Sequence, residues 1–234
     1  MKDFLFNLFF PKICLGCGRE EEYLCQDCKA ILEILRIHFR YKTQHLSDLY
    51  YSCGYQNFLI KKLIKFFKYE PFLKELSKSL SSLIIEHLQS LENPPPFLSG
   101  GQDFVLIPIP LEKRRLKRRG FNQAEEIGKE LSKFLKIPLL NNVLIKTRRT
   151  PPQVELSDVE RRENIKGVFL AQNNNLIKDK KILLVDDVYT TGSTMEECAR
   201  ILKRPTEGEC PGAKEIIGIV VARAKPEEDY FKNI

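Results

Sequence analysis

The stretch KILLVDDVYTTGSTM, residues Lys181–Met195, decides the fold. Its first part, Ile182–Val185, is a continuous apolar run, which is typical of a strand buried on both faces of a parallel sheet. Asp186 and Asp187 follow at the carboxyl end of this strand, the edge where open α/β sheets bind ligands. A small hydroxyl-rich turn then leads into a helix. One face of that helix is apolar and consists of Met195, Cys198, Ala199 and Leu202.

The turn and the two acids have the chemistry of a sugar-phosphate site. The N-terminus of a helix presents free backbone N–H groups and favours an anion. Gly192 allows the backbone to approach a phosphate closely, and the neighbouring hydroxyls add donors. Asp186 and Asp187, the candidate catalytic residues, suit the vicinal hydroxyls of a ribose or a Mg²⁺ held through water. The candidate substrate-binding residues of the turn are Thr190, Thr191, Gly192, Ser193 and Thr194.

The alternative is a strand–turn–helix in which the aspartates only cap the helix. Two adjacent acids followed by TTGST favour the ligand site instead. The stretch resembles the motif with which type I phosphoribosyltransferases bind 5-phosphoribosyl 1-pyrophosphate (PRPP). No GxxxxGK[ST] and no GxGxxG occurs in the sequence, which excludes a P-loop and a dinucleotide fingerprint.

Length and composition bound the fold class. A chain of 234 residues with 43% hydrophobic residues predicts a folded, soluble protein with one sizeable core and a small satellite module. The net charge of +7 favours anionic partners, either phosphates or nucleic acid. The apolar N-terminal ten residues, MKDFLFNLFF, are too short to span a bilayer. We expect them to form a helix docked on the body, with weak membrane association as the minority alternative.

Four of the seven cysteines form two CxxC pairs separated by seven residues. The glycines beside the second cysteine allow a tight turn, and four thiolates satisfy a tetrahedral structural Zn²⁺ with no open position. An iron–sulfur cluster or two redox pairs remain as alternatives. This cysteine usage also favours a reducing compartment. The predicted zinc ligands are Cys14, Cys17, Cys25 and Cys28.

Hydrophobic periodicity places the other elements. We predict a helix over 26–38, a hairpin or sheet edge over 48–56, a helix capped by Asn57, and another helix beginning at Pro71. From residue 104 onward strands and helices alternate, which predicts right-handed βαβ units around a parallel sheet. Four lysines of the helix after Asn57 are interpreted as solvated: Lys61, Lys62, Lys65 and Lys68.

A dense basic run follows the predicted strand 104–109, and we expect it to be a loop. A cationic loop at the end of a strand can hold a pyrophosphate. Its candidate substrate-binding residues are Arg114, Arg115 and Arg118. The run Lys113–Arg119 has more charge than one pyrophosphate needs, and a nucleic-acid surface is a further alternative, although Phe121 is the only interleaved aromatic residue. The plain alternative is a solvated charge run. The charged, proline-containing segment 147–164 is typical of a lid or a disordered connection.

Taken together, the chain resembles the ComF family of phosphoribosyltransferase-like competence proteins. The resemblance rests on the four cysteines, IPIPLEKRRLKRRGFNQAEEI, TPPQVELSDVERREN and VDDVYTTGST, and it covers nearly the whole chain. It implies an α/β fold, a type I phosphoribosyltransferase-like parallel sheet flanked by helices with a small N-terminal zinc module. The implied division is a zinc module over 1–45, a hairpin and helical part over 46–100, and the phosphoribosyltransferase-like domain over 101–234.

The resemblance also implies what the protein binds and where it acts. PRPP with Mg²⁺ would bind at the acids, the turn and the basic run, with 147–164 as a closing loop. The family acts in natural competence in the cytoplasm, so the implied partners are single-stranded DNA and DNA-uptake proteins. We expect Arg118 and Arg119, at the end of the basic run, to contact this DNA. Two functions remain open: an adaptor that keeps the phosphate pocket, or an enzyme that transfers ribose 5-phosphate to an unidentified base. A role in carbon metabolism is a weaker third option.

Overall fold

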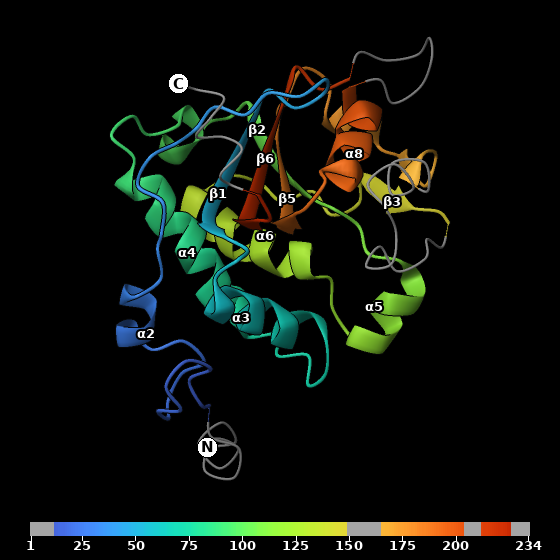
Figure 1. Cartoon of the computed structure of the whole chain (residues 1–234). Coiled ribbons are helices and arrows are strands. Elements are labelled where there is room, and N and C mark those ends of the chain that lie inside the picture. Colours follow the sequence, from blue (N-terminus) through green and yellow to red (C-terminus); the bar gives the residue numbers. More distant parts are fainter. Residues whose placement is uncertain (1–11, 149–164, 204–211, 226–234) are drawn as a thin grey trace.

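A four-stranded parallel sheet forms the centre of the computed structural model, which describes residues 12–148, 165–203 and 212–225 (Figure 1). The strand order is β1-β6-β5-β2. The strands are β1 (Asp48–Gly54), β2 (Phe104–Pro108), β5 (Lys181–Tyr189) and β6 (Glu215–Arg223). The predicted parallel sheet is therefore confirmed, with the stretch that decides the fold in an interior strand.

Strand β5 is longer than its apolar run. Ile182–Val185 are fully buried between β2 and β6, as the continuous apolar pattern requires. Pairing with β6 then continues, with Asp186 opposite Val220 and Tyr189 opposite Arg223. The two acids therefore lie near the carboxyl end of β5, in the part of the strand that still pairs with β6, and the sheet fixes the position of their backbone.

Helices cover both faces of the sheet (Figure 1). Alternate residues of β5 and β6 face a core shared with α3 (Phe58–Lys68), α4 (Leu76–Ser90) and α6 (Gln123–Leu135). The other residues face a core shared with α8 (Ser193–Lys203). The helix patterns read from sequence for α3 and α8 are confirmed, and Asn57 caps α3 by accepting from the N–H groups of Leu59 and Ile60.

Smaller elements complete the chain. Strands β3 (Leu144–Lys146) and β4 (Phe169–Ala171) form a separate antiparallel pair. Short 3-10 helices are η1 (Pro96–Ser99) and η3 (Asn174–Leu176). The expected N-terminal helix and most of the expected lid, 149–164, lie outside the described residues. Within the described ranges no helix is long and apolar enough to cross a membrane.

Three sequence predictions were wrong in detail. The helix expected over 26–38 is only α2 (Gln26–Ala30), because the following chain runs beside β1, where the N–H of Leu35 donates to the carbonyl of Ser52. The helix expected from Pro71 begins at Leu76, because the N–H groups of Phe72 and Leu73 donate to the carbonyls of Tyr69 and Phe66 in a turn.

The third error concerns the basic run, which is not a loop but a helix, α5 (Lys113–Arg119). Lysine and arginine are good helix formers, and Gly120 ends the helix in the left-handed conformation with φ 79°. For residues 48–56 the sequence predicted either a hairpin or a sheet edge. The structure shows the sheet edge, because β1 is an edge strand that runs parallel to β6. The region proposed as 46–100 thus contributes a strand to the same sheet as residues 104–223.

Candidate functional site

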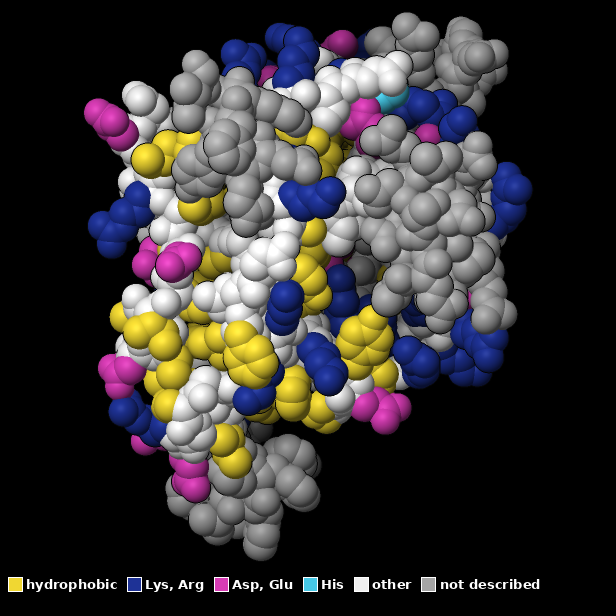
Figure 2. All heavy atoms as spheres, viewed as in Figure 1, with side chains coloured by type: hydrophobic (Ala, Val, Ile, Leu, Met, Phe, Trp, Pro, Cys, Tyr) yellow, Lys and Arg dark blue, Asp and Glu magenta, His cyan; other side chains and the backbone are white. Residues whose placement is uncertain are grey.

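A cleft of about 1320 Å³ opens at the carboxyl ends of the strands. It lies between the end of β5, the first turn of α8, helix α5 and helix α3. Every site residue predicted from the sequence for the ligand lines this one cleft: Asp186, Asp187, Thr190, Thr191, Gly192, Ser193, Thr194, Arg114, Arg115 and Arg118. Figure 2 shows Lys and Arg side chains gathered over α3 and α5 on this face of the molecule.

The turn before α8 is shaped to expose backbone N–H groups. Gly192 has φ +77°, and the N–H of Glu196 donates to its carbonyl at 2.8 Å, which begins the helix. The hydroxyls of Thr191 and Ser193 are hydrogen-bonded at 2.8 Å. A Cβ at Gly192 would collide with the phenol ring and hydroxyl of Tyr189. Glycine is therefore required here by the backbone conformation and by a neighbouring side chain.

The two acids differ in their surroundings. Asp187 Oδ1 lies 2.9 Å from Lys68 Nζ, and its side chain is only 5% exposed. Asp186 Oδ1 accepts the backbone N–H of Asp187 at 2.9 Å. Burial and the neighbouring charge of Asp187 raise the pKa of Asp186 to about 7, although Lys68 opposes this shift. Asp186 is therefore the acid of the pair that titrates near neutral pH, and Asp187 is the one that contacts the ammonium group of Lys68.

Lys68 is a site residue that sequence reasoning missed. Burial opposes its charge, but the carboxylates of Asp187 and Asp186 outweigh that effect and raise the pKa of Lys68. Its helix also sends Lys61 and Lys65 into the lining of the cleft, so only Lys62 of the four lysines lies outside it. The signal was the spacing of these three lysines, which places positions 61, 65 and 68 on one face of a helix.

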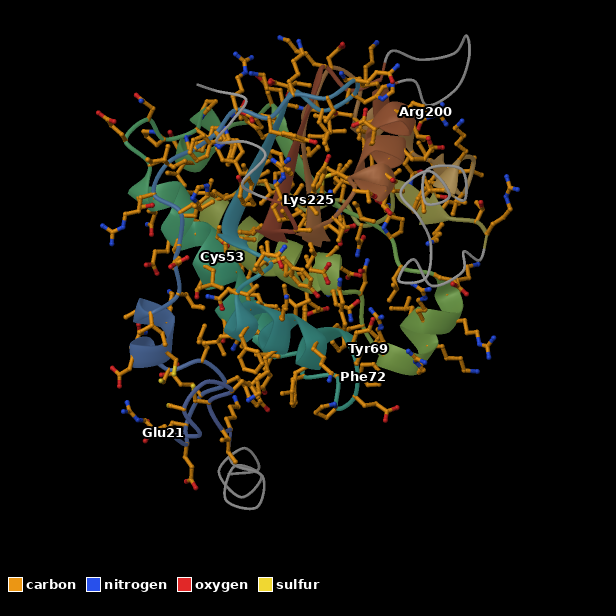
Figure 3. All side chains as sticks on the ribbon, viewed as in Figure 1. Glu21, Cys53, Tyr69, Phe72, Arg200 and Lys225 are labelled. Carbon is orange, nitrogen blue, oxygen red and sulfur yellow. The ribbon has the colours of Figure 1, made fainter. Side chains whose placement is uncertain are left out.

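Helix α5 forms the opposite wall, and two of its arginines pack against aromatic rings. The guanidinium of Arg119 lies 5.7 Å from the ring centre of Tyr69, and that of Arg118 lies 6.0 Å from the ring centre of Phe72. Figure 3 shows Tyr69 and Phe72 beside α5. Arg119 Nη1 donates to Gln123 Oε1 at 2.8 Å, and burial lowers the pKa of the Arg119 guanidinium. Arg119 is thus part of the cleft wall, whereas we expected a DNA-contacting surface residue.

A buried arginine, Arg223, packs against Tyr189, the residue that contacts the turn before α8. Arg223, only 3% exposed, lies 3.9 Å from the ring centre of Tyr41 and 5.7 Å from that of Tyr189. The hydroxyl of Tyr189 donates to that of Tyr41 at 3.4 Å. Because Tyr189 packs against Gly192, this stack fixes the position of the turn. No sequence pattern pointed to Arg223, since it meets Tyr41 only through tertiary packing.

Hydrogen bonds connect the first turn of α8 to residues 43–45, which are distant in sequence. The carboxylate of Glu196 accepts from the hydroxyl of Thr43 at 2.5 Å and from the backbone N–H of His45 at 2.9 Å. Glu196 also lies 2.8 Å from Nδ1 of His45. These bonds tie residues 43–45 to the helix that begins at the candidate phosphate turn.

The four predicted metal ligands lie together. The sulfur atoms of Cys14, Cys17, Cys25 and Cys28 are all within 4.8 Å of one another. Tetrahedral thiolates around zinc, with Zn–S distances of about 2.3 Å, stand about 3.8 Å apart. Backbone N–H groups of Cys25 and Cys28 donate to sulfur atoms of Cys14 and Cys25, each at 3.4 Å. This donor set fits a structural zinc ion.

The four-cysteine loop packs on α4 and on α3, the second of which borders the cleft. Its buried cysteines belong to the same core as α3 and α4. Ion pairs join Lys12 to Glu75 at 2.6 Å and Lys29 to Glu86 at 2.9 Å. A Cβ at Gly16 would collide with Cys28 and touch Leu59 of α3. The loop therefore supports α3 from the side opposite the cleft.

Comparisons with known proteins agree with this architecture. The profile of the phosphoribosyl transferase domain matches residues 116–233. Competence protein F of Haemophilus influenzae is 32% identical over 196 residues, which cover 83% of this chain and 80% of that protein. Competence protein ComFC of Bacillus subtilis is 28% identical over 201 residues, covering 81% and 71%. The DNA utilization protein YhgH of Escherichia coli O157:H7 is 38% identical over 99 residues, covering 42% and 43%.

Proposed function

Because this chain belongs to the ComF family of competence proteins and carries a phosphoribosyl transferase domain, we propose that it binds PRPP and acts in DNA uptake. One observation carries the PRPP assignment: a single cleft brings together an acidic pair, a hydroxyl-rich turn at a helix N-terminus and a cationic helix. The names of the relatives from Haemophilus influenzae and Bacillus subtilis support the competence role.

Each part of the cleft has a task in this proposal. The turn Thr190–Thr194 binds the 5′-phosphate through backbone N–H groups and hydroxyls, as helix N-termini do. Asp186 and Asp187 accept hydrogen bonds from the ribose hydroxyls. Arg114 and Arg115 neutralise the pyrophosphate, for which arginine is suited by its paired donors. These roles require both acids to be ionised, which Lys68 favours by its charge next to Asp187.

Two metal ions belong to the proposal. The acidic pair is the set of residues that would hold Mg²⁺ together with PRPP, and the ion would supply charge neutralisation of the pyrophosphate. The four cysteines would hold a structural Zn²⁺ that stabilises the N-terminal loop. We further propose that residues 1–45 serve as a zinc module, and that residues 46–100, which contribute β1 and α3, join residues 101–234 in binding the ligand.

Calorimetry with PRPP and Mg²⁺ tests the assignment. We expect Asp187→Asn to weaken PRPP binding by about tenfold or more, since a hydrogen bond to a charged group is lost. Asp103→Asn is the matched control, because Asp103 is exposed and precedes β2 at the opposite edge of the sheet. If the wild-type protein binds no PRPP, or if both variants bind alike, the assignment is wrong.

Transfer of ribose 5-phosphate to a base is the second candidate function. The observation that favours it is the concentration of cations on α5, which would stabilise pyrophosphate as a leaving group. The step breaks the C1–O bond of PRPP and forms a C1–N bond to the base. Pyrophosphate released from PRPP only in the presence of a base would establish this activity, and its absence across a panel of bases would leave the binding role.

A further inference from the structure

The cleft carries more positive charge than PRPP needs. Among the described residues that line it, nine are lysine or arginine and three are acidic, a formal excess of six positive charges. PRPP, with a phosphate and a pyrophosphate, carries about five negative charges near neutral pH, and Mg²⁺ offsets two of them. Excess positive charge therefore remains after PRPP and Mg²⁺ are bound.

The unused charge is concentrated on α3. Several lining cations already contact polar groups of the protein: Lys68 with Asp187, Arg115 with Glu112 and Arg119 with Gln123. Lys61 and Lys65, in contrast, are exposed and form no ion pair within the described part of the chain. They lie one helical turn apart and continue the line that leads to Lys68. This line forms a cationic strip on the α3 wall of the cleft, across from α5.

Aromatic rings flank the same strip. Tyr55 precedes α3, Tyr69 follows it, and both line the cleft. Tyr69 is 46% exposed although the guanidinium of Arg119 lies against it, so part of its ring is open to a ligand. Tyr55 is half-buried, so Tyr69 offers the more open ring. An exposed aromatic ring beside lysines is the combination that stacks a base and neutralises a phosphate.

We propose that the α3 wall, with Lys61, Lys65, Tyr55 and Tyr69, binds the second ligand of the cleft, and that this ligand is a nucleoside unit that carries phosphate. This inference rests on the proposed function, because it assigns to PRPP the part of the cleft between α5 and the turn before α8. A free nucleotide and a single-stranded nucleic acid offer the same chemistry. A neutral base or nucleoside would leave the lysines without a partner.

The test is calorimetry on the zinc-loaded full chain, with and without saturating PRPP and Mg²⁺. The probes are thymidine, thymidine 5′-monophosphate and oligothymidylate. We expect both phosphate-bearing probes to bind at least about tenfold more tightly than thymidine. The double variant Lys61→Ala/Lys65→Ala should lose this preference and retain its PRPP affinity. Lys62→Ala is the matched control, since Lys62 belongs to the same helix and does not line the cleft.

Each outcome decides the inference. Tighter binding of the monophosphate identifies the free nucleotide as the source, and tighter binding of the oligomer identifies the nucleic acid, provided that the double variant removes the preference. Equal binding of all three probes, no binding, or an unchanged preference in the double variant overturns the inference. If the wild-type protein does not bind PRPP, the proposed function is wrong. The affinities of the three probes for PRPP-free protein still test the inference about the α3 wall.

Discussion

Lys68 Nζ lies 2.9 Å from Asp187 Oδ1 and thereby joins the end of α3 to the end of β5. The carboxylate side chain is 5% exposed and the lysine side chain 27%, so the pair is largely shielded from solvent. A carboxylate at this depth needs a cation to remain charged. The ion pair therefore maintains one charge of the acidic pair before any ligand arrives.

Removing this cation should destabilise the protein. Lys68→Met keeps most of the side-chain volume but leaves the carboxylate of Asp187 without its partner. We expect the free energy of unfolding to fall by about 1–3 kcal/mol, as for other buried charges that lose a partner. Urea unfolding measures this change. Lys62→Met, outside the cleft on the same helix, should change stability by no more than about 0.5 kcal/mol. Equal effects of the two substitutions would contradict the structural role.

The raised pKa of Asp186 predicts how binding depends on pH. With a pKa of about 7, the ionised fraction of this carboxyl rises from about a tenth near pH 6 to about nine tenths near pH 8. If the ionised form binds the ribose and Mg²⁺, PRPP affinity should increase by up to about tenfold over this range. Asp186→Asn should retain only the pH dependence that the ligand's own phosphates cause.

The same shift predicts a dependence of stability on pH with the opposite sign. The unfolded chain releases the proton of Asp186 near pH 4, whereas the folded protein holds it until about pH 7. The contribution of Asp186 to stability is therefore full below about pH 4 and is lost as the pH rises to about 7. Urea unfolding of Asp186→Asn should lack this loss. An identical pH profile in both proteins would show that Asp186 titrates normally.

Substitution of Gly192 should abolish phosphate binding while the sheet remains intact. Gly192→Ala places a Cβ against the ring of Tyr189 and imposes a strained φ of +77°. We expect the affinity for ribose 5-phosphate to fall by about a hundredfold, because the turn must move away from its position. Gly120→Ala is the control: it has a similar φ, +79°, but no atom within 4 Å of the added Cβ. Similar losses in both variants would mean that strain alone, and not the contact with Tyr189, is responsible.

Loss of the metal ion from the four cysteines should also destabilise α3. We expect one zinc per chain by elemental analysis, and Cys17→Ser should remove it and destabilise the N-terminal loop by several kcal/mol. Because the loop packs against α3, amide hydrogen exchange should increase in α3 and remain unchanged in α8 on the other face of the sheet. Iron or no metal in the wild-type protein would contradict the ligand assignment, and uniform exchange changes would contradict the local coupling.

The two arginines at the end of α5 should separate DNA binding from PRPP binding. Arg118→Ala should reduce by about one the slope with which single-stranded DNA affinity falls with salt, as expected for one lost phosphate contact. Arg119→Ala should chiefly weaken PRPP, because Arg119 is packed into the cleft wall beside Gln123. Fluorescence anisotropy of oligothymidylate over a salt series measures the slope. If Arg118→Ala leaves the slope unchanged, α5 does not contact DNA.

Local patterns were sufficient for the strands, the phosphate turn and the metal cluster. The run Ile182–Val185 indicates its own burial, and the CxxC pairs indicate their own proximity, because each signal lies within a few residues. The approach of Lys68 to Asp187 could not be read in this way, since it depends on where α3 crosses the end of β5. The same holds for Arg223 and Tyr41, whose contact is created by the pairing of β6 with its neighbours.

The basic run shows why charge alone misleads. The seven residues Lys113–Arg119, six of them cations, were interpreted as a pyrophosphate-binding loop because they follow a strand that ends in prolines. The helix α5 has no buried residue, so no apolar stripe could reveal it. Its boundaries were nevertheless present in the sequence, with Gly120 as the residue that ends it in the left-handed conformation.

The strand order has a consequence for how this domain can be isolated. The matched profile begins at residue 116, after β1 and β2, so of the four-stranded sheet it includes only the two interior strands, β5 and β6. A fragment cut at that boundary would leave the outer side of β6, which pairs with β1, and the outer side of β5, which pairs with β2, without partners. Unpaired edges of apolar strands recruit strands of other molecules. By pairing both of these edges, the N-terminal half of the chain therefore also keeps the profile-matched half from associating with copies of itself.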